Sequence, residues 1–269
     1  MSVAIEQGPA ASRKGARRLT DVTEELRASL EAGLPSATHI EQMAIRMDRL
    51  LASEFPLLVD HPGLAALERC GFVHKMRLMG AILADAFGDD AAGMASESGS
   101  DTVRGWGAFA AAEVSDHDQH VQSLQVFAED PHFSVREMAW LALRPTACQH
   151  TEMTIRCLAP LALERSPFLR RFASEATRPR GVWSTHITTL KANPELARKI
   201  LDPLRADPSR YVRRSVGNWL NDAAKDNPTW VGDVLSDWRS ADPPVASDVM
   251  TRARVRVDQA EEGVEIEPA

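Results

Sequence analysis

A repeated Asp-Pro motif constrains the fold of this 269-residue chain more than any other feature. Segments 130–137 and 207–214 share an Asp-Pro turn, a four-residue step and a Val-Arg pair that opens an apolar helix, with the arginine at Arg136 and Arg213. Segment 166–173 is a shorter third copy that places Arg171 in the equivalent position, so the arginines lie 35 and 42 residues apart. This period is typical of HEAT-type repeats, in which each unit is a pair of helices. The sequence therefore predicts an all-α fold, a right-handed solenoid of stacked helix pairs.

Composition agrees with a helical, folded chain. Hydrophobic residues make up 44% and charged residues 26% of the sequence, and there is one Tyr. Apolar residues recur at intervals of three and four, and Pro or Gly separates stretches of helical length. Asp or Ser before Pro is expected to cap the second helix of each pair, with Pro at its first position. We expect a flexible N-terminus over 1–18, a single repeat domain over 19–257 with its strongest repeats at 127–239, and an acidic disordered tail over 258–269.

Several other classes of protein are disfavoured. No apolar run approaches the roughly 18 residues of a membrane helix, and the basic stretch 13–18 precedes no apolar signal segment. We therefore expect a cytoplasmic monomer. The three cysteines form no CxxC pair, which disfavours a disulfide framework and a cysteine-built zinc site. His117 and His120 lie in an acidic stretch that we interpret as a solvated loop or helix entry, so no metal and no cofactor is expected.

Positive charge is concentrated in one segment. The chain has a net charge of −7, but residues 165–225 hold 13 Lys and Arg against 5 Asp and Glu, a balance of +8 that leaves −15 elsewhere. Helical projection of 210–225 separates a polar face from an apolar one. The polar face holds Arg214, Asn218, Asn221, Asp222 and Lys225, and the apolar face holds Val212, Val216, Trp219, Leu220 and Ala223. In the preceding copy Arg171, Glu175 and Arg178 line up in the same way, so each of two successive repeats holds one carboxylate among cations. A solvated face of i,i+4 ion pairs is the alternative interpretation.

Three strings of the sequence resemble the AlkC/AlkD superfamily of DNA alkylation repair proteins, nearer to AlkC. They are Ser-Asp-Thr-Val-Arg-Gly-Trp at 100–106, Arg-Arg-Phe-Ala-Ser-Glu-Ala-Thr-Arg-Pro-Arg-Gly-Val-Trp at 170–183 and Tyr-Val-Arg-Arg-Ser-Val-Gly-Asn-Trp-Leu-Asn-Asp-Ala-Ala-Lys-Asp-Asn-Pro at 211–228. The resemblance covers roughly residues 97–239. It implies HEAT-like repeats forming a concave cationic groove for duplex DNA, and a monofunctional glycosylase acting on cationic alkylated bases.

The resemblance also implies roles for individual residues. Glu175 and Asp222 occupy the motif carboxylates that face the deoxyribose of the lesion, and Arg171 occupies the arginine that contacts the DNA backbone nearby. Glu137 matches a further acid of the AlkC groove. Ser134 and Glu137 also fit a capping box, which would give Glu137 a structural role. Asn218 stands where the AlkD branch has an aromatic residue, and the sequence ends without the additional C-terminal domain of well-studied AlkC proteins.

The remaining candidates are expected to bind DNA, most of them through phosphates. This set comprises Arg178, Arg180, Arg213, Arg214, Asn218 and Lys225, together with two tryptophans, Trp183 and Trp140. Trp183 follows a Pro- and Gly-rich turn, where it either stacks on a sugar or base of the DNA or packs in the protein core. The same two alternatives remain for Trp140. Trp219 is expected to lie in the core.

Two functions remain open at this point. A cationic alkylated base leaves readily, so a carboxylate that stabilises the oxocarbenium-like sugar and orients a water is sufficient for excision. The rival is a non-catalytic HEAT scaffold that binds DNA or an acidic protein partner. The enzyme hypothesis requires Glu175 and Asp222 to face one place, whereas opposite faces would favour the scaffold. The sequence alone does not identify which alkylated base is preferred or whether catalytic activity is retained. It also does not identify whether the duplex is bent or whether a partner protein replaces the missing domain.

Overall fold

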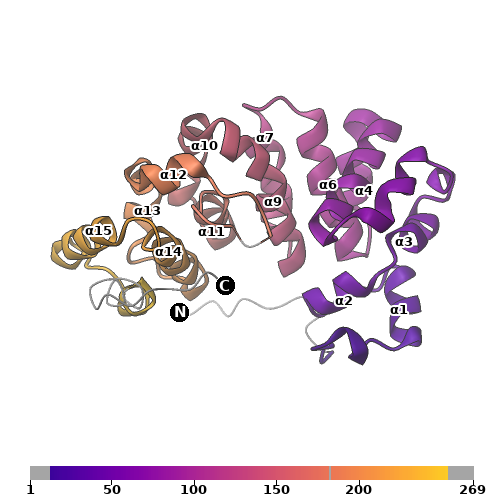
Figure 1. Cartoon of the computed structure of the whole chain (residues 1–269), viewed down its shortest axis with the longest axis horizontal. Coiled ribbons are helices and arrows are strands. Elements are labelled where there is room, and N and C mark those ends of the chain that lie inside the picture. Colours follow the sequence, from indigo (N-terminus) through magenta and orange to yellow (C-terminus); the bar gives the residue numbers. More distant parts are fainter. Residues whose placement is uncertain (1–12, 182, 254–269) are drawn as a thin grey trace. The chain divides into compact units, whose positions relative to one another are not determined.

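The chain is all-α. The computed structural model describes residues 13–181 and 183–253, and within these ranges it contains helices and no strand (Figure 1). The residues fall into two compact units, 1–142 and 143–269, and the boundary lies within helix α9 (Phe133–Gln149). The predicted all-helical fold is thus confirmed. The single domain expected over 19–257 stays a prediction, and the expected tail at 258–269 lies outside the described residues.

The first unit consists of α-helices joined by short 3₁₀ helices. Its α-helices before α9 are α1 (Glu24–Glu31), α2 (His39–Ala44), α3 (Met47–Glu54), α4 (Phe72–Phe87), α5 (Ala91–Ser96), α6 (Asp101–Val114), α7 (His120–Ser123) and α8 (Gln125–Ala128), and its 3₁₀ helices are η2 (Leu19–Asp21), η3 (Pro56–Leu58), η4 (Pro62–Arg69) and η5 (Gly88–Asp90). Helices α4 and α6 pack side by side (Figure 1). Gly80 permits their close approach, because a Cβ there would lie 2.4 Å from Cβ of Phe109.

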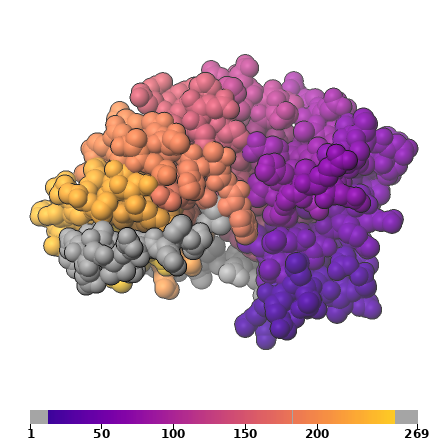
Figure 2. Space-filling view, in the orientation of Figure 1, coloured from indigo at the N-terminus to yellow at the C-terminus, as the bar shows by residue number. Residues whose placement is uncertain are grey.

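The second unit continues the helical pattern. Its helices are α10 (Thr151–Leu158), η6 (Ala159–Leu163), α11 (Pro167–Ala176), α12 (Thr188–Ala192), η7 (Pro194–Ala197), α13 (Arg198–Leu204), α14 (Arg210–Ala223) and α15 (Pro228–Ser240). Helices α11 and α14 are neighbours, and the apolar face predicted for α14 is buried through Val212, Val216 and Trp219. The indole of Trp219 donates to the Thr177 carbonyl at 2.9 Å, so this tryptophan belongs to the core as expected. Closely packed side chains cover the helices that Figure 1 draws as separate ribbons (Figure 2).

Four arginines define the true register of the repeats. Nη1 of each donates to the carbonyls six and five residues earlier, at 2.6 to 3.0 Å; these arginines are Arg104, Arg136, Arg170 and Arg213. The third copy therefore aligns through Arg170, and the predicted equivalence of Arg171 with Arg136 and Arg213 is wrong by one residue. The shift has a simple reason, because Arg170 and Arg171 are adjacent in a copy that lacks the Asp-Pro turn. It places Arg171 and Arg214 at equivalent positions.

Three of these arginines also bind an acid that lies further along the chain. The Nε atoms of Arg104 and Arg170 lie 2.7 and 2.6 Å from Asp130 and Asp207, and Arg213 Nε lies 2.8 Å from Asp248. Each such pair ties consecutive parts of one unit together, as nearest-neighbour contacts do in repeat proteins.

The helix starts differ in part from the predicted capping pattern. Pro167 is the first residue of α11 as expected, but its N-cap Ser166 makes no side-chain capping bond. Pro131 and Pro208 precede the starts of α9 and α14. Asp130 and Asp207 instead accept from the backbone amides two residues on, at 2.6 and 2.7 Å. The aspartates thus fix the turns that lead into the helices.

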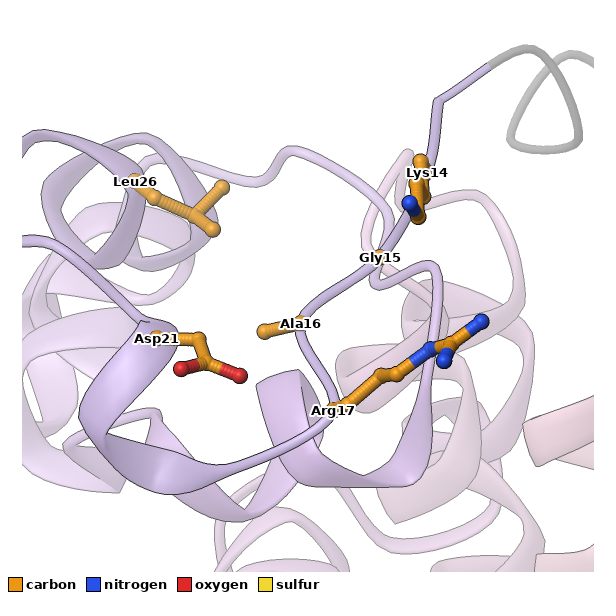
Figure 3. Close-up of a pocket in the computed structure, with 6 residues that line it drawn as sticks. All are labelled: Lys14, Gly15, Ala16, Arg17, Asp21 and Leu26. Atoms are coloured by element: carbon orange, nitrogen blue, oxygen red, sulfur yellow. The ribbon is translucent and has the colours of Figure 1, made fainter.

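The segment 13–18, expected to be flexible, is anchored in the first unit. Glu41, fully buried, accepts hydrogen bonds from the Arg13 guanidinium and from the amides of Ala16 and Ala37. Gly15 lies so close to Thr38 that a Cβ would fall 2.5 Å from its methyl group. A shallow pocket adjoins this segment (Figure 3), lined by Lys14, Gly15, Ala16, Arg17, Asp21 and Leu26. Residues 1–12 lie outside the described residues.

The lengths of the helices and the state of the cysteines can also be compared with the sequence-based expectations. Within 13–181 and 183–253, none of the helices combines the length and apolarity that a membrane crossing requires. The three cysteines are unpaired and half-buried.

Candidate active site

The two motif carboxylates lie at the C-terminal ends of neighbouring helices. Glu175 is the penultimate residue of α11 and Asp222 is the penultimate residue of α14. Their residues are 2% and 5% exposed, respectively. An acid in the last turn of a helix faces the negative end of the helix dipole, and burial removes the water that would stabilise its charge. Both acids therefore require cationic partners.

Arg178 supplies that partner for both acids at once. It follows the end of α11, and its Nη1 donates to Glu175 Oε2 at 3.1 Å. Its Nε and Nη2 donate to Asp222 Oδ2 at 2.9 and 2.6 Å. The carboxylates of Glu175 and Asp222 thus converge on one guanidinium and do not point to opposite faces of the unit. We call this cluster of three residues the Arg178 bridge.

The Arg178 bridge is an electrostatically coupled group. Burial alone would lower the pKa of the Arg178 guanidinium, but the adjacent Glu175 and Asp222 carboxylates outweigh burial and raise it above its ordinary value. The Arg178 side chain is 14% exposed, so solvent screens these interactions less than it would at the surface. Arg178, expected at a DNA phosphate, is in this structure bound to the two acids.

Two further cations contact the outer oxygens of the bridge. Arg171 Nη2 lies 3.4 Å from Glu175 Oε1, and its guanidinium stacks 4.3 Å from the ring centroid of Tyr211. Lys225 Nζ lies 3.5 Å from Asp222 Oδ1. Each carboxylate therefore has one oxygen on Arg178 and the other beside a more peripheral cation.

Two of the expected DNA-binding cations are paired with acids that lie outside segment 165–225. Arg180 donates to Asp226 at 3.0 and 2.8 Å, and that hydrogen bond raises the pKa of the guanidinium. Arg213 is bound to Asp248. The local excess of positive charge is thus smaller in the folded unit than the count over 165–225 indicates.

Exposed and unpaired cations remain on α14. Arg210 and Arg214 are exposed and one helical turn apart, and neither side chain makes an ion pair or hydrogen bond to another residue in 13–181 or 183–253. Asn218, one turn further along, accepts at 2.8 Å from Arg252. Arg252 lies against Gly217, where a Cβ would fall 2.8 Å from Arg252 Cδ.

Trp183 lies in the loop between α11 and α12. It is 54% exposed and has a φ of 62°, a left-handed conformation that is unusual for a bulky residue. The expected Pro- and Gly-rich turn therefore presents an aromatic surface toward solvent. Loop residues of this kind are more often functional than those of a packed core.

Glu137 and Trp140 belong to the first unit, whereas the Arg178 bridge lies wholly in the second. Trp140 Nε1 donates to Glu137 Oε2 at 2.9 Å, and Trp140 is buried. The capping-box interpretation of Ser134 and Glu137 is wrong, because α9 begins at Phe133 and the Ser134 hydroxyl donates to Asp101.

Arg144 is the residue that sequence reasoning missed. Its guanidinium, 1% exposed, donates to the carbonyls of the loop that follows α11, and desolvation lowers its pKa to about 10. These carbonyls belong to Thr185, Ala176, Arg178 and Pro179. No local sequence signal separates this arginine from a surface one, since its partners lie 32 to 41 residues away.

Among the described residues, no group of three or more His, Cys, Asp and Glu side chains is arranged to hold a metal ion. His117 and His120 contact each other edge to face at 5.3 Å between ring centroids. His120 begins α7, as a helix entry would, but it is buried and its Nε2 lies 2.9 Å from the Ser115 carbonyl oxygen.

Comparison with solved structures shows that other proteins have a similar fold. The solved structure of the alkylpurine DNA glycosylase AlkC from Pseudomonas fluorescens, bound to DNA containing an abasic site analog, matches 91% of this chain and 64% of that chain with a TM-score of 0.60 and 22% identity. The crystal structure of smu.31 from Streptococcus mutans UA159 matches 72% of this chain and 95% of that chain, with a TM-score of 0.53 and 21% identity.

In sequence, the uncharacterized protein YhaZ of Bacillus subtilis strain 168 is 33% identical over 126 residues, which are 47% of this chain and 34% of YhaZ. No family model matches the chain. The chain thus spans less than two thirds of the length of YhaZ and of AlkC.

Proposed function

We propose that this chain, which has the helical-repeat fold of the AlkC glycosylase, belongs to the AlkC/AlkD superfamily and excises cationic alkylated bases such as 3-methyladenine from duplex DNA. The observation that carries the proposal is the convergence of Glu175 and Asp222, from neighbouring helices, on Arg178. Two buried carboxylates at one place are the equipment that this hydrolysis requires.

The proposed reaction needs little acid catalysis. An alkylated purine such as 3-methyladenine is already positively charged, so the bond from C1′ to the base nitrogen breaks with its electron pair going to the base, which leaves neutral. Positive charge then develops on the deoxyribose, where the carboxylates of Glu175 and Asp222 stabilise it electrostatically. Water attacks C1′ and one carboxylate accepts its proton, which leaves an abasic site without strand cleavage.

Binding of the duplex is proposed to use the cations around the Arg178 bridge. Arg210 and Arg214 have no acidic partner in the described residues and are exposed, which suits them for phosphates. Arg171 and Lys225 are placed beside the acids and would hold the backbone next to the lesion. Trp183 is proposed to stack on a base or sugar. Activity as a monomer in the cytoplasm remains part of the proposal.

A non-catalytic scaffold is the second candidate, and the burial of the acids favours it. Glu175 and Asp222 are nearly inaccessible and ion-paired with Arg178, as expected for structural ion pairs between helices. In that case the same unit would bind DNA or an acidic protein without catalysing a reaction. The glycosylase and the scaffold differ in one observable, the release of a base from the DNA.

Incubation of the purified protein with methylated duplex DNA, followed by chromatography of the released bases, tests the proposal. We expect release of 3-methyladenine and an abasic site that is cut only after alkali. Borohydride should trap no protein–DNA adduct, because the acids are accompanied by Arg and the nearby Lys225 is bound to Asp222. Absence of any released base would refute the proposed glycosylase activity, and a trapped adduct would refute the hydrolytic mechanism.

A further inference from the structure

We propose that Arg144 is a positioning residue, which fixes the described residues 177–181 and 183–187 of the loop between α11 and α12, so that Arg178 is held between Glu175 and Asp222. The inference rests on the proposed function for its effect on base excision, but its structural part can be tested without it. Its basis is an unusual arrangement in which a buried guanidinium binds, among the described residues, main-chain carbonyls alone.

The first step of the argument concerns the partners of Arg144. Nε donates to the Thr185 carbonyl at 2.7 Å, and Nη1 donates to the Arg178 carbonyl at 2.7 Å. Longer bonds of 3.4 and 3.5 Å reach the carbonyls of Ala176 and Pro179. No carboxylate among residues 13–181 and 183–253 lies within ion-pair distance of this guanidinium. Arg144 thus spans both sides of the loop at once.

The second step concerns energy. A guanidinium that is buried without an ion-pair partner loses its hydration, and this desolvation lowers its pKa to about 10. Part of that loss is offset by the carbonyl dipoles at the end of α11, since a cation is favourable at a helix C-terminus. An apolar residue would fill the same space without the desolvation. The retained charge therefore points to a role in holding these carbonyls in place.

The third step concerns the tightness of the loop. A Cβ at Gly181 would fall 2.0 Å from Ser184 Oγ and 3.3 Å from Arg144 Cζ, so the loop folds directly over the guanidinium. The Ile187 amide donates to the Pro179 carbonyl at 3.0 Å and closes the loop. Trp183 lies between these two points in the chain and has a left-handed φ of 62°.

The fourth step connects the loop to the site. Arg178 contributes its carbonyl to Arg144 and its guanidinium to the two acids, so the two sets of bonds act on one residue. A shift of its backbone would move the guanidinium relative to Glu175 and Asp222. Misplacement of a catalytic group by about 1 Å costs on the order of 10²-fold in rate. Arg144 therefore acts on the reaction through Arg178, without contact to the substrate.

The test uses Arg144→Met, which keeps an apolar side chain of comparable reach, and Arg144→Lys, which keeps the charge but lacks the planar fork. Arg104→Met is the matched control, because Arg104 also binds main-chain carbonyls, but in the first unit. Hydrogen exchange of the full-length protein is followed over 177–187 and over the rest of the chain. Single-turnover base release is measured at saturating protein and well below the melting temperature.

We expect both Arg144 variants to lose exchange protection over 177–187 selectively and to release base about 10- to 100-fold more slowly, with DNA affinity changed less than threefold. Arg104→Met should lower the melting temperature without either effect. Unchanged protection of the loop would overturn the proposal, whether or not the wild-type protein excises a base. If the Arg144 variants lose exchange protection over 177–187 but release base at the wild-type rate, the proposed effect of Arg144 on excision through Arg178 would be overturned. Failure of the wild-type protein to excise while the loop still responds would refute only the proposed function.

Discussion

The two units satisfy buried carboxylates in different ways. In the first unit, Asp101 is fully buried and accepts from the Ser36 amide at 2.7 Å and from the hydroxyls of Ser36 and Ser134. His132, 3.4 Å away, is fixed through its Nε2 to the Ser36 carbonyl. In the second unit, Glu175 and Asp222 depend mainly on the side chain of Arg178.

This difference separates an acid that joins segments from acids that can act on a ligand. The donors to Asp101 come from residues 36 and 134, which lie 65 and 33 positions away in the chain, and they leave the carboxylate no freedom to change partners. A single arginine side chain can exchange its partners when a substrate cation or phosphate arrives, without unfolding of the backbone. We therefore expect substitution of Asp101 to affect stability, and substitution of the acids in the Arg178 bridge to affect chemistry.

The largest effect is expected from Glu175→Gln and Asp222→Asn. Each substitution preserves shape and removes a charge that stabilises the oxocarbenium ion, so single-turnover base release should fall on the order of 10²- to 10³-fold. Each leaves Arg178 with one carboxylate, which should preserve the fold. DNA affinity should stay equal or rise slightly, because an acid repels phosphates. A wild-type rate in both variants would exclude the catalytic role, and a large drop in melting temperature would assign the acids to structure.

Asp101→Asn should show the opposite pattern. Loss of the charge weakens three short hydrogen bonds and leaves buried donors poorly paired, so the free energy of unfolding should fall by about 2 to 4 kcal/mol. Chemical denaturation measures this change. The rate of base release per folded molecule should match the wild type, and a specific loss of that rate would remove the contrast between the two units.

A smaller effect is expected on the salt dependence of DNA binding. Replacing the exposed Arg210 and Arg214 by Ala should flatten the slope of log affinity against log salt by about 0.9 for each phosphate that the protein no longer neutralises. Arg213, which is bound to Asp248 and to its own turn, serves as the comparison, and Arg213→Ala should mainly lower the melting temperature. Equal slopes for the wild type and for the Arg210, Arg214 double variant would exclude this part of α14 from the interface.

The smallest effect concerns pH and the first unit. Burial lowers the pKa of His120 below its ordinary value of 6.5, and the nearby His117 adds to that shift, whereas the Ser115 carbonyl and Asp116 oppose it. A lowered pKa means that His120 binds a proton more tightly in the unfolded chain than in the folded one. The free energy of unfolding is therefore unaffected by this histidine above about pH 6.5 and declines as the pH falls below that value. Denaturation curves at pH 7.5 and 5.5 should show this decline, and His120→Gln should reduce it. A variant with the same pH dependence as the wild type would assign the effect to other groups.

Sequence predicted the features that depend on local periodicity. The all-helical fold follows from apolar spacing, and the burial of Val212, Val216 and Trp219 follows from their common face on one helix. The meeting of Glu175 and Asp222 could be expected because both end helices of neighbouring repeats.

Features that depend on distant pairing were missed. Asp226 and Asp248 neutralise Arg180 and Arg213 from 46 and 35 residues away, so a count of charges over 165–225 overestimates the positive field. The register error at Arg171 arose because two adjacent arginines fit one motif, and only the carbonyls that Arg170 binds distinguish them. Arg144 resembled a surface residue because its partners are main-chain atoms, which carry no sequence signature.

That last property bears on how the loop 177–187 can evolve. Arg144 binds carbonyl oxygens, which every amino acid provides, so its hold on the loop does not depend on which side chains the loop presents. Gly181 is an exception, since any larger residue would collide with Ser184, and Arg178 is fixed by its bonds to the two acids. The exposed position of Trp183 is open to substitution while the path of the backbone is kept. A lineage could diversify the surface beside the two acids in this way, one residue at a time, without rebuilding the scaffold.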